Sequence, residues 1–454
     1  MAEILIIGGS DAGISAALRA RELDPSSEVV MVLKDAYPNF SICGIPFYLG
    51  GEVADWHHLA HRTREELLDA GIALRTETTA LAVDPDGRRV TVSGPNGPET
   101  LAYDALIVAT GAEPARPGIP GADLPGVFVL HDMDEAFALE AHLENPHVRR
   151  AAIIGAGYIG CEMAESLTRR GLEVTLLERA RTVLPTFDPP LGDLIGDMLR
   201  QRGLNLATGV RVTEIRSDPD ESLRVEGEPD VAVSADVVLL VAGVRPRTAL
   251  LESAGLDPGI RGAIPVRRTM ATAVPGIFAA GDCVETYHRL LDRPTYLPLG
   301  TTAHKQGRVA GENAVGGERL YPGSLGTQAV KVFDLVAART GLSDADAVQG
   351  GFDSVSAAHT GWDHKAYYPG AKDLHIRLTG DRRTRRLLGA QMLGEHGTEV
   401  SKRIDILAAS IFNGMTVDAL MDLDLSYTPP LSSPWDPVQV AAEAWCRVAD
   451  LQAR

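Results

Sequence analysis

The chain has 454 residues, of which 45% are hydrophobic and 23% charged, as is typical of soluble globular proteins. Its 43 basic and 61 acidic residues give a formal net charge of −18, which opposes nonspecific binding to nucleic acid or to an anionic membrane. No apolar run is long enough to span a bilayer. At roughly 150 residues per domain, the length predicts three domains and leaves room for a large buried cofactor.

The chain opens with a predicted strand, a glycine-rich turn and a helix. Residues 4–7 are apolar and strand-like, and 14–23 have helical spacing. The acid at position 3 and the short apolar run argue against a secretory signal, so we expect a cytoplasmic protein. The turn lets the backbone approach a pyrophosphate at the helix start. The candidate cofactor-binding residues here are Gly8, Gly9, Ser10, Ala12 and Gly13.

Two features weaken this turn as a dinucleotide signal. Ser10 stands where the middle glycine of G-x-G-x-x-G is usual, and the turn alone is also compatible with a strand–helix connection that binds nothing. The next strand should end in an acid that accepts from a ribose hydroxyl, but it ends in Leu33-Lys34-Asp35. Asp35 is therefore a displaced candidate for the ribose contact.

The segment 37–51, YPNFSICGIPFYLGG, places Cys43 among Gly, Pro and aromatic residues. The other cysteines, Cys161, Cys283 and Cys446, are far away in the sequence, and neither a CxxC pair nor a Cys/His cluster occurs. This spacing disfavours a disulfide framework and a structural metal site. It leaves a lone reactive thiol as a candidate.

Residues 62–125 are predicted to form the remaining elements of the first unit and then the connection to the next domain. We expect a helix over 62–70, a strand near Ile72, and a hairpin that turns at Gly-Pro-Asn-Gly, 94–97. Residues 103–114 read as a buried strand that runs into Thr110-Gly111. The Pro/Gly-rich stretch that follows predicts a crossing between domains.

A second strand–turn–helix unit begins near residue 149 and has the full glycine pattern, Gly155, Gly157 and Gly160. Glu178 closes the following strand 23 positions after Gly155, which is the expected order and spacing for a dinucleotide site. A carboxylate there accepts from a free ribose 2′-hydroxyl and repels a 2′-phosphate, which favours NADH. The nearby Arg179 and Arg181 leave NADPH as the alternative donor.

The rest of the chain repeats these patterns and then changes character. Residues 236–248 resemble 104–114, and Gly281-Asp282 follows a short strand, with a helix predicted from near Thr301. Strand-like runs at 327–340, 351–360, 373–380 and 385–393 precede helices at 397–413 and from 436 onward. We expect a split domain (1–112 and 243–325), an inserted domain (113–242) and a C-terminal α+β domain (326–454).

Together these motifs resemble the flavoprotein pyridine nucleotide-disulfide reductases. The similarity is to their single-cysteine branch, which contains coenzyme A-disulfide reductases, NADH oxidases and NADH peroxidases. It rests on GGSDAG, SICGIPFYLGG, the ATG at 109–111, GAGYIGCE, GVRP, GIFAAGD, AYYPGAK and DLSYTPPLSSPWDPV. The resemblance implies an α/β fold with two Rossmann-like dinucleotide-binding domains, for FAD and NAD, plus a C-terminal α+β dimerisation domain.

The resemblance also implies roles for individual residues. Asp282 would bond the ribityl chain of FAD, and the helix after Gly300 would point at the flavin. Tyr158 resembles the aromatic gate over the flavin, unless it only packs at the helix start, and Glu162 would position the nicotinamide. The other candidate cofactor-binding residues are Thr110, Gly111, Ile159, Gly243, Gly281, Thr301, Thr302 and Ala303.

Cys43 is predicted to be the nucleophile that exchanges with substrate sulfur. The thiolate is the reactive form, and no Lys or Arg adjoins Cys43, so its stabilisation would come from the N–H groups of Gly44 onward and from oxidised flavin. No second cysteine follows until Cys161, so its partner must be external: a low-molecular-weight thiol, a persulfide or peroxide. The alternative is a small buried hydrophobe.

Phenols are candidate acids for the leaving thiolate, because their pKa near 10 is close to that of a thiol. By resemblance, Tyr427 and one of the pair Tyr367/Tyr368 would supply them, although strand packing is an alternative for that pair. In the family this C-terminal segment reaches the flavin site of the other subunit. The resemblance therefore implies a homodimer with shared active sites.

The substrate side departs from the family pattern at two places. Asp11 stands where NADH oxidases and peroxidases carry His, which disfavours peroxidase chemistry. Arg19 and Arg21 are candidates for coenzyme A phosphates, or else form a solvated helix face, but Glu22 replaces a further basic residue. The candidate substrate-binding residues are Asp11, Arg19, Arg21 and Ser41.

The sequence thus predicts an FAD-dependent, NADH-preferring reductase of a low-molecular-weight disulfide or persulfide. One alternative is an NADH oxidase or peroxidase that acts on oxygen or peroxide through a sulfenic acid on Cys43. An alternative of another class is a flavin-linked electron carrier or redox-responsive binding protein in which Cys43 is structural.

Overall fold

The first apolar run forms an inner strand of a parallel sheet. In the computed structural model, which describes residues 2–219 and 222–452, β1 (Glu3–Ile7) pairs with β2 (Glu28–Val32) on one side and β7 (Ala105–Val108) on the other. The order is β18-β7-β1-β2-β3, where β3 is Ile72–Arg75 and β18 is Ile277–Ala279. β1 and β7 are buried on both faces, which explains their continuous apolar runs. Because β18 lies far along the chain, two distant segments complete one sheet.

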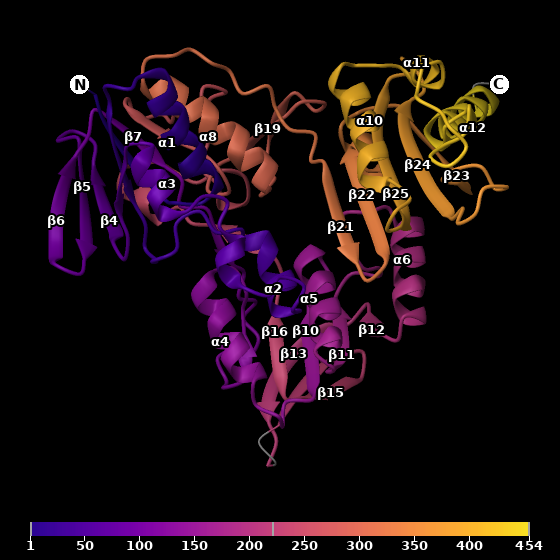
Figure 1. Cartoon of the computed structure of the whole chain (residues 1–454), viewed down its shortest axis with the longest axis horizontal. Coiled ribbons are helices and arrows are strands. Elements are labelled where there is room, and N and C mark those ends of the chain that lie inside the picture. Colours follow the sequence, from indigo (N-terminus) through magenta and orange to yellow (C-terminus); the bar gives the residue numbers. More distant parts are fainter. Residues whose placement is uncertain (1, 220–221, 453–454) are drawn as a thin grey trace.

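The inserted segment forms a second parallel sheet, with the order β12-β11-β10-β16-β9. β10 (Arg150–Ile154) is an inner strand, and α5 (Tyr158–Arg169) follows it through the second glycine turn. Figure 1 shows this unit below the other two, with α4 (Met133–Leu143) and α5 on one side of its sheet. The other strands are β9 (Val127–Phe128), β11 (Glu173–Glu178), β12 (Asn205–Thr208) and β16 (Val237–Leu240).

The chain crosses between these units through a short antiparallel pair. β8 (Ala112–Pro114) pairs with β17 (Val244–Pro246), so the outgoing and returning segments lie side by side. Because this pair is where both crossings occur, we propose the domain boundaries 1–112 with 243–325, 113–242, and 326–454.

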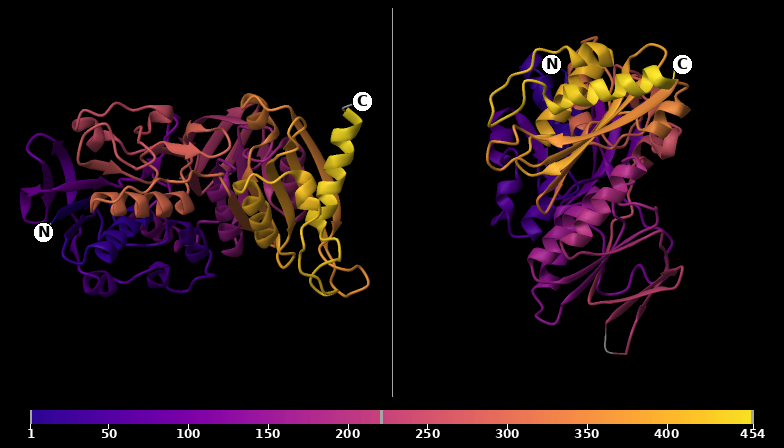
Figure 2. Two further views of the ribbon diagram at one scale, coloured as in Figure 1. Left: turned by 90° about the horizontal axis from the view of Figure 1, so that it is seen from above. Right: turned by 90° about the vertical axis from the view of Figure 1, so that its right-hand side faces the viewer.

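The C-terminal part is an antiparallel sheet with helices packed on it, in the order β21-β22-β25-β24-β23. Figure 2 shows it at the end of the molecule opposite the first unit. The strand-like run at 327–340 forms a hairpin, because the chain turns at Phe333, whose φ is 55°. The strands are β21 (Gln328–Val332), β22 (Leu335–Gly341), β23 (Ser354–Trp362), β24 (Asp373–Asp381) and β25 (Leu387–Glu395).

A helix and a hairpin that the sequence predicts in the first unit are both present. The helix expected at 62–70 is α3 (Arg64–Asp69), which Thr63 and Glu66 close with a capping box, and the predicted hairpin joins β5 (Arg89–Gly94) to β6 (Gly97–Ala102). Within 2–219 and 222–452, no helix is long and apolar enough to cross a membrane. The other elements are α1 (Asp11–Leu23), α2 (Ile45–Leu49), α6 (Pro189–Gln201), α7 (Ala249–Ser253), α8 (Gly300–Ala314), α9 (Asp344–Gln349), α10 (Val400–Phe412), α11 (Val417–Met421), α12 (Pro437–Gln452), β4 (Thr79–Asp84), β13 (Arg211–Ser217), β14 (Leu223–Glu228), β15 (Val231–Ala235), β19 (Thr286–His288), β20 (Arg293–Thr295) and the 3-10 turns η1 (Ile42–Gly44), η2 (Trp56–Leu59) and η3 (Ile260–Gly262).

Candidate active site

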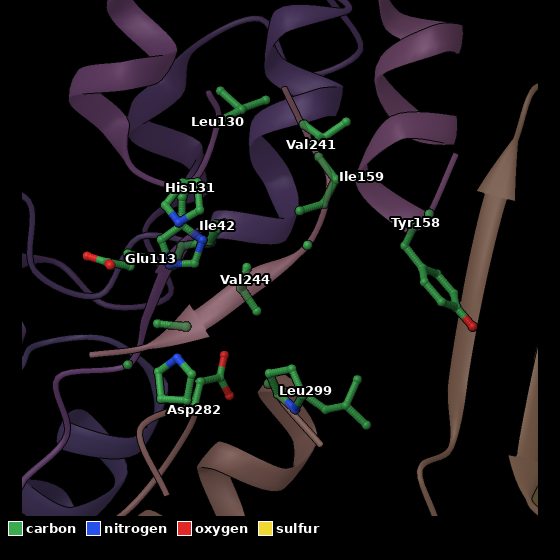
Figure 3. Close-up of a pocket in the computed structure, with 18 of the residues that line it drawn as sticks. Ile42, Glu113, Leu130, His131, Tyr158, Ile159, Val241, Val244, Asp282 and Leu299 are labelled. Atoms are coloured by element: carbon green, nitrogen blue, oxygen red, sulfur yellow. The ribbon is translucent and has the colours of Figure 1, made fainter. Parts of the chain in front are cut away.

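A cavity of about 2570 Å³ is lined by residues of both parallel-sheet units. Both glycine turns, the Cys43 segment, the β8/β17 crossing and the start of α8 line it. Figure 3 shows part of the lining, with Asp282 and Leu299 at one side and Tyr158 and Ile159 at another. A cavity of this size has room for two dinucleotides, and it opens at the carboxyl ends of the parallel strands, where such folds bind ligands.

The two glycine turns have nearly the same backbone geometry. Gly8 and Gly155 have φ values of +115° and +114°, which favour glycine, and a Cβ at either would collide with a backbone carbonyl. Ser10 (φ −101°, ψ −162°) follows the same extended path as Gly157 (φ −77°, ψ −165°). The substitution of Ser10 for the middle glycine therefore leaves the course of the first turn unchanged.

Open space is available where a pyrophosphate would approach. A Cβ at Gly157 would have no neighbour within 4 Å, and the same is true at Gly111 and Gly243, which also line the cavity. The third glycines differ: a Cβ on Gly13 or Gly160 would come within 2 Å of the carbonyl oxygen of the first glycine. Gly13 and Gly160 therefore allow close helix–strand packing and do not line the cavity.

The acids predicted to accept from ribose hydroxyls both line the cavity. The Glu178 carboxylate accepts from the amides of Ala156 and Ala180, each at 2.7 Å, so it is held between the second glycine turn and the segment after β11. Asp35 accepts from the amide of Tyr37 at 2.9 Å, and burial raises the pKa of Asp35 above its usual value. Arg179 and Arg181 both line the cavity, and Arg181 also pairs with Asp193 at 2.5 Å.

The residues at the predicted flavin end separate into cavity-lining and packing groups. Asp282, Gly281, Thr301 and Ala303 line the cavity, and burial followed by the charge of Asp11 raises the pKa of Asp282 to about 7. The Thr302 side chain is instead buried against Ser324, 3.2 Å away. The residues present fit FAD and a nicotinamide dinucleotide, because the glycine turns leave open space beside free helix N-termini at both ends.

The second unit positions Cys43. η1 and α2 carry the Cys43 segment, and α2 lies against α5. Ser166 donates to the Pro46 carbonyl at 2.6 Å, and Arg170 donates to the Leu49 carbonyl at 3.2 Å. Tyr48 donates to Glu140 at 2.6 Å. These contacts hold the thiol at the junction of the two units.

In the chain without a cofactor, the surroundings of Cys43 oppose its thiolate, and the stabilisation expected from the N–H groups of Gly44 onward and from oxidised flavin stays a prediction. Cys43 is exposed to the cavity, yet the surrounding protein still desolvates it. That desolvation raises the pKa of Cys43 above its usual value, and the carboxylates of Glu162, Asp11 and Asp282 raise it further. A nearby positive charge or a bound group would oppose these effects and favour the thiolate.

Tyr158 and Glu162 lie on the first turns of α5 and line the cavity. The Tyr158 hydroxyl is 3.4 Å from Thr186, and burial raises its pKa to about 12. Burial and the charge of Glu165 raise the pKa of Glu162 to about 7, and Lys331 opposes the shift. Glu162 is thus suited to exchange a proton near neutral pH.

Two of the four predicted substrate residues lie away from the cavity. Asp11 and Ser41 line it, but Arg19 and Arg21 do not. Arg19 pairs with Glu312 at 2.7 Å and with Glu22 at 2.9 Å. Arg21 donates to the carbonyls of Ala70, Pro25 and Ser27. These contacts give both arginines a packing role, and their contact with substrate remains a prediction.

The candidate phenols lie outside the cavity of their own chain. Tyr367 and Tyr427 are 73% and 43% exposed, and their side chains interact with each other. Tyr368 packs instead edge-on against His364, with ring centroids 5.8 Å apart. Of the pair, Tyr367 is therefore the one placed beside Tyr427.

The cavity also contains residues that the sequence motifs did not single out. His304, on α8, is 3.2 Å from Asp11, and His131 and Glu113 lie near the β8/β17 crossing. Burial lowers the pKa of His131 below its usual value. The position of His304 within TTAHKQGR, at the start of a predicted helix, was a usable signal for a cavity residue.

Comparisons with known proteins agree with this geometry. The family pattern described as "Pyridine nucleotide-disulphide oxidoreductase" matches residues 2–307, and its dimerisation domain matches 327–437. The chain is 36% identical to the NAD(P)H sulfur oxidoreductase (CoA-dependent) of Pyrococcus furiosus, over 97% of this chain and 98% of that one.

Two solved structures are similar over the whole chain. The NAD-dependent persulfide reductase from A. fulgidus has a TM-score of 0.95 and 36% identity, and the match covers 99% of this chain and 84% of that one. The water-forming NADH oxidase from Lactobacillus brevis, bound to NADH, also has a TM-score of 0.95. It is 29% identical, and the match covers 100% of both chains.

Proposed function

Because the chain belongs to the pyridine nucleotide-disulphide oxidoreductase family, whose enzymes use FAD and NAD(P)H, we propose that it is an NADH-preferring reductase of a low-molecular-weight disulfide or persulfide. The observation that carries the proposal is the position of Cys43. Among the described residues, it is the cysteine that lines the cavity, whereas Cys161, Cys283 and Cys446 are buried. Four free thiols also suit a reducing compartment such as the cytoplasm.

The chemistry at Cys43 follows from this arrangement. The thiolate attacks one sulfur of the substrate, a new S–S bond forms, and the substrate's own S–S bond breaks with its electron pair on the leaving thiolate. The leaving thiolate takes up a proton and departs as thiol. When bound, the flavin supplies the two electrons from NADH that release the second thiol and regenerate Cys43.

The test is a half-reaction experiment without oxygen. The purified holoenzyme is reduced with NADH and then mixed separately with coenzyme A disulfide, a persulfide, peroxide or oxygen, while flavin absorbance and the mass of any adduct on Cys43 are followed. We expect fast reoxidation by the disulfide or persulfide. Fast reoxidation by oxygen alone would replace the proposal with an NADH oxidase, the second candidate, which the similarity to the L. brevis enzyme favours. Flavin reduction without a titratable thiol would favour an electron carrier.

The preference for NADH rests on Glu178. We expect Glu178→Ala to raise the KM for NADH about tenfold, because a hydrogen bond to a ribose hydroxyl is lost. The kcat/KM for NADPH should rise, because Arg179 then lines the cavity without the opposing carboxylate. Steady-state kinetics with both nucleotides measure the ratio, and Glu178→Gln, which keeps one acceptor oxygen, is the matched control. An unchanged NADH/NADPH ratio in Glu178→Ala would contradict the assignment.

We also propose a homodimer in which Tyr427, beside Tyr367, reaches the partner's active site. The dimerisation pattern at 327–437 supports this, as does the exposure of Leu431 (69%) and Trp435 (58%) close to Tyr427. Such large exposed apolar side chains mark a contact surface. A phenol supplied by the partner would explain why neither tyrosine lies in the cavity of its own chain.

The shared site predicts complementation between variants. We expect Tyr427→Phe to slow disulfide reduction by about 100-fold, the lower end of the range for loss of a general acid. If the site is shared, a mixed dimer of Cys43→Ser and Tyr427→Phe chains contains one site with both residues intact. Its activity should then approach half of the wild-type value. Mixed dimers no more active than the Tyr427→Phe homodimer would place both residues in one chain.

A further inference from the structure

Asp11, a candidate substrate-binding residue, forms a pair in the cavity wall with His304, and the proposed reaction assigns this pair no role. His304 Nε2 is 3.2 Å from Asp11 Oδ1, and His304 Nδ1 is hydrogen-bonded to Ser15 Oγ at 2.7 Å. Both ring nitrogens therefore have partners, which fix the orientation of the imidazole. Asp11, His304 and Cys43 all line the same cavity.

The packing of two helices brings this pair together from positions almost 300 residues apart in the sequence. On α8, a Cβ at Gly307 or Gly311 would come 2.2 Å from the carbonyl oxygen of Ala12 or Ala16 on α1, so the two backbones are in direct contact. Gly300, the first residue of α8, lies against the Asp11 carboxylate, where a Cβ would be 2.8 Å from Oδ2. The first turns of α1 and α8 are thereby held side by side at the cavity wall.

The contact between Asp11 and His304 affects the charge around the Cys43 thiol. The carboxylates of Glu162, Asp11 and Asp282 oppose a thiolate, and no Lys or Arg adjoins Cys43 in the sequence. A protonated His304 in contact with Asp11 cancels one of these charges at close range. We propose that His304 is the counter-charge of the Cys43 site: its ion pair with Asp11 offsets the carboxylate that would otherwise suppress the thiolate.

His304 acts on Cys43 through Asp11 and is therefore a positioning residue. The hydrogen bond and charge of Asp11 raise the pKa of His304, while partial burial and the neighbouring Lys305 oppose the shift. The imidazolium is thus retained to higher pH than in free histidine, and its effect is lost as the pH rises through the raised pKa. Asp11 also interacts electrostatically with Asp282 and raises its pKa, after the larger effect of burial.

The role of His304 in turnover rests on the proposed function, but its effect on the thiol can be measured independently. The experiment follows the rate of Cys43 alkylation by iodoacetamide against pH in the holoenzyme, with mass spectrometry to confirm the modified residue. We expect His304→Gln to slow alkylation at pH 7 by about three- to tenfold, because an uncompensated Asp11 raises the pKa of Cys43. Asp11→Asn should speed alkylation, and in that background His304→Gln should change the rate less than twofold.

Lys305→Gln is the matched control, because it removes one positive charge at the next position of α8 and leaves the ion pair intact. The proposal is overturned if Lys305→Gln and His304→Gln slow alkylation equally, or if the effect of His304→Gln persists without Asp11. Circular dichroism and flavin content check that each variant is folded. If the wild type reduces no disulfide or persulfide, only the proposed function fails, because the alkylation result does not depend on the substrate.

Discussion

Cys43→Ser is expected to reduce turnover with disulfide and persulfide substrates by about 10³-fold or more, which is typical of removing a nucleophile that forms a covalent intermediate. Reduction of the bound flavin by NADH should persist, because the predicted nicotinamide residues around Glu178 and Glu162 are unchanged. Stopped-flow absorbance separates the two half-reactions, and mass spectrometry tests for loss of the adduct. Serine preserves the size of the side chain, so the Cys43 segment should fold as before.

Cys446→Ser is the matched control for this substitution. Cys446 is buried on α12, and burial followed by the charge of Asp418 raises its pKa to about 11, so it is a poor nucleophile at neutral pH. We expect wild-type turnover from Cys446→Ser. Full activity of Cys43→Ser with every disulfide and persulfide would exclude Cys43 as the exchanging thiol and leave the oxidase or the electron carrier.

Asp436→Ala should lower the free energy of unfolding by about 3–5 kcal/mol, because it leaves the buried guanidinium of Arg403 without its counter-ion. Arg403 on α10 and Asp436 are buried, with side chains 6% and 8% exposed, and they lie 3.2 Å apart. Arg403 also donates to the carbonyls of Thr398 and Asp363, and Asp436 accepts from Ser432. The network ties the segment that carries Tyr427 to α10.

Urea unfolding followed by tryptophan fluorescence measures this effect. Three of the four tryptophans, Trp362, Trp435 and Trp445, lie in the C-terminal part, so its transition can be followed separately. Asp405→Ala breaks an exposed ion pair with Lys402 on the same helix and should change stability by less than about 0.5 kcal/mol. Equal midpoints for Asp436→Ala and Asp405→Ala would show that the buried pair contributes little.

The family and the fold class were predictable from the sequence, and both are confirmed. The signals are local: the second glycine turn needs only the spacing of Gly155, Gly157 and Gly160 between a strand and a helix. Glu178 follows at the end of the next strand, where its carboxylate accepts from the amide of Ala156 in the turn and from that of Ala180 just after the strand. The turn at Phe333 within the strand-like run 327–340 had no comparable local signal, and Ser10, which weakened the first turn as a dinucleotide signal, follows the same backbone path as Gly157.

The environment of the thiol depends on contacts that no local pattern encodes. The sequence identified Cys43 as a lone thiol in a turn-rich segment, and it showed the absence of an adjacent Lys or Arg. Its pKa is raised by desolvation and then by Glu162, Asp11 and Asp282, which come from three distant parts of the chain. His304 reaches Asp11 only because glycines of α8 let its backbone touch α1. The sequence thus determined which residue types stand in each motif and could react. The tertiary packing of distant helices decided which charged groups surround them.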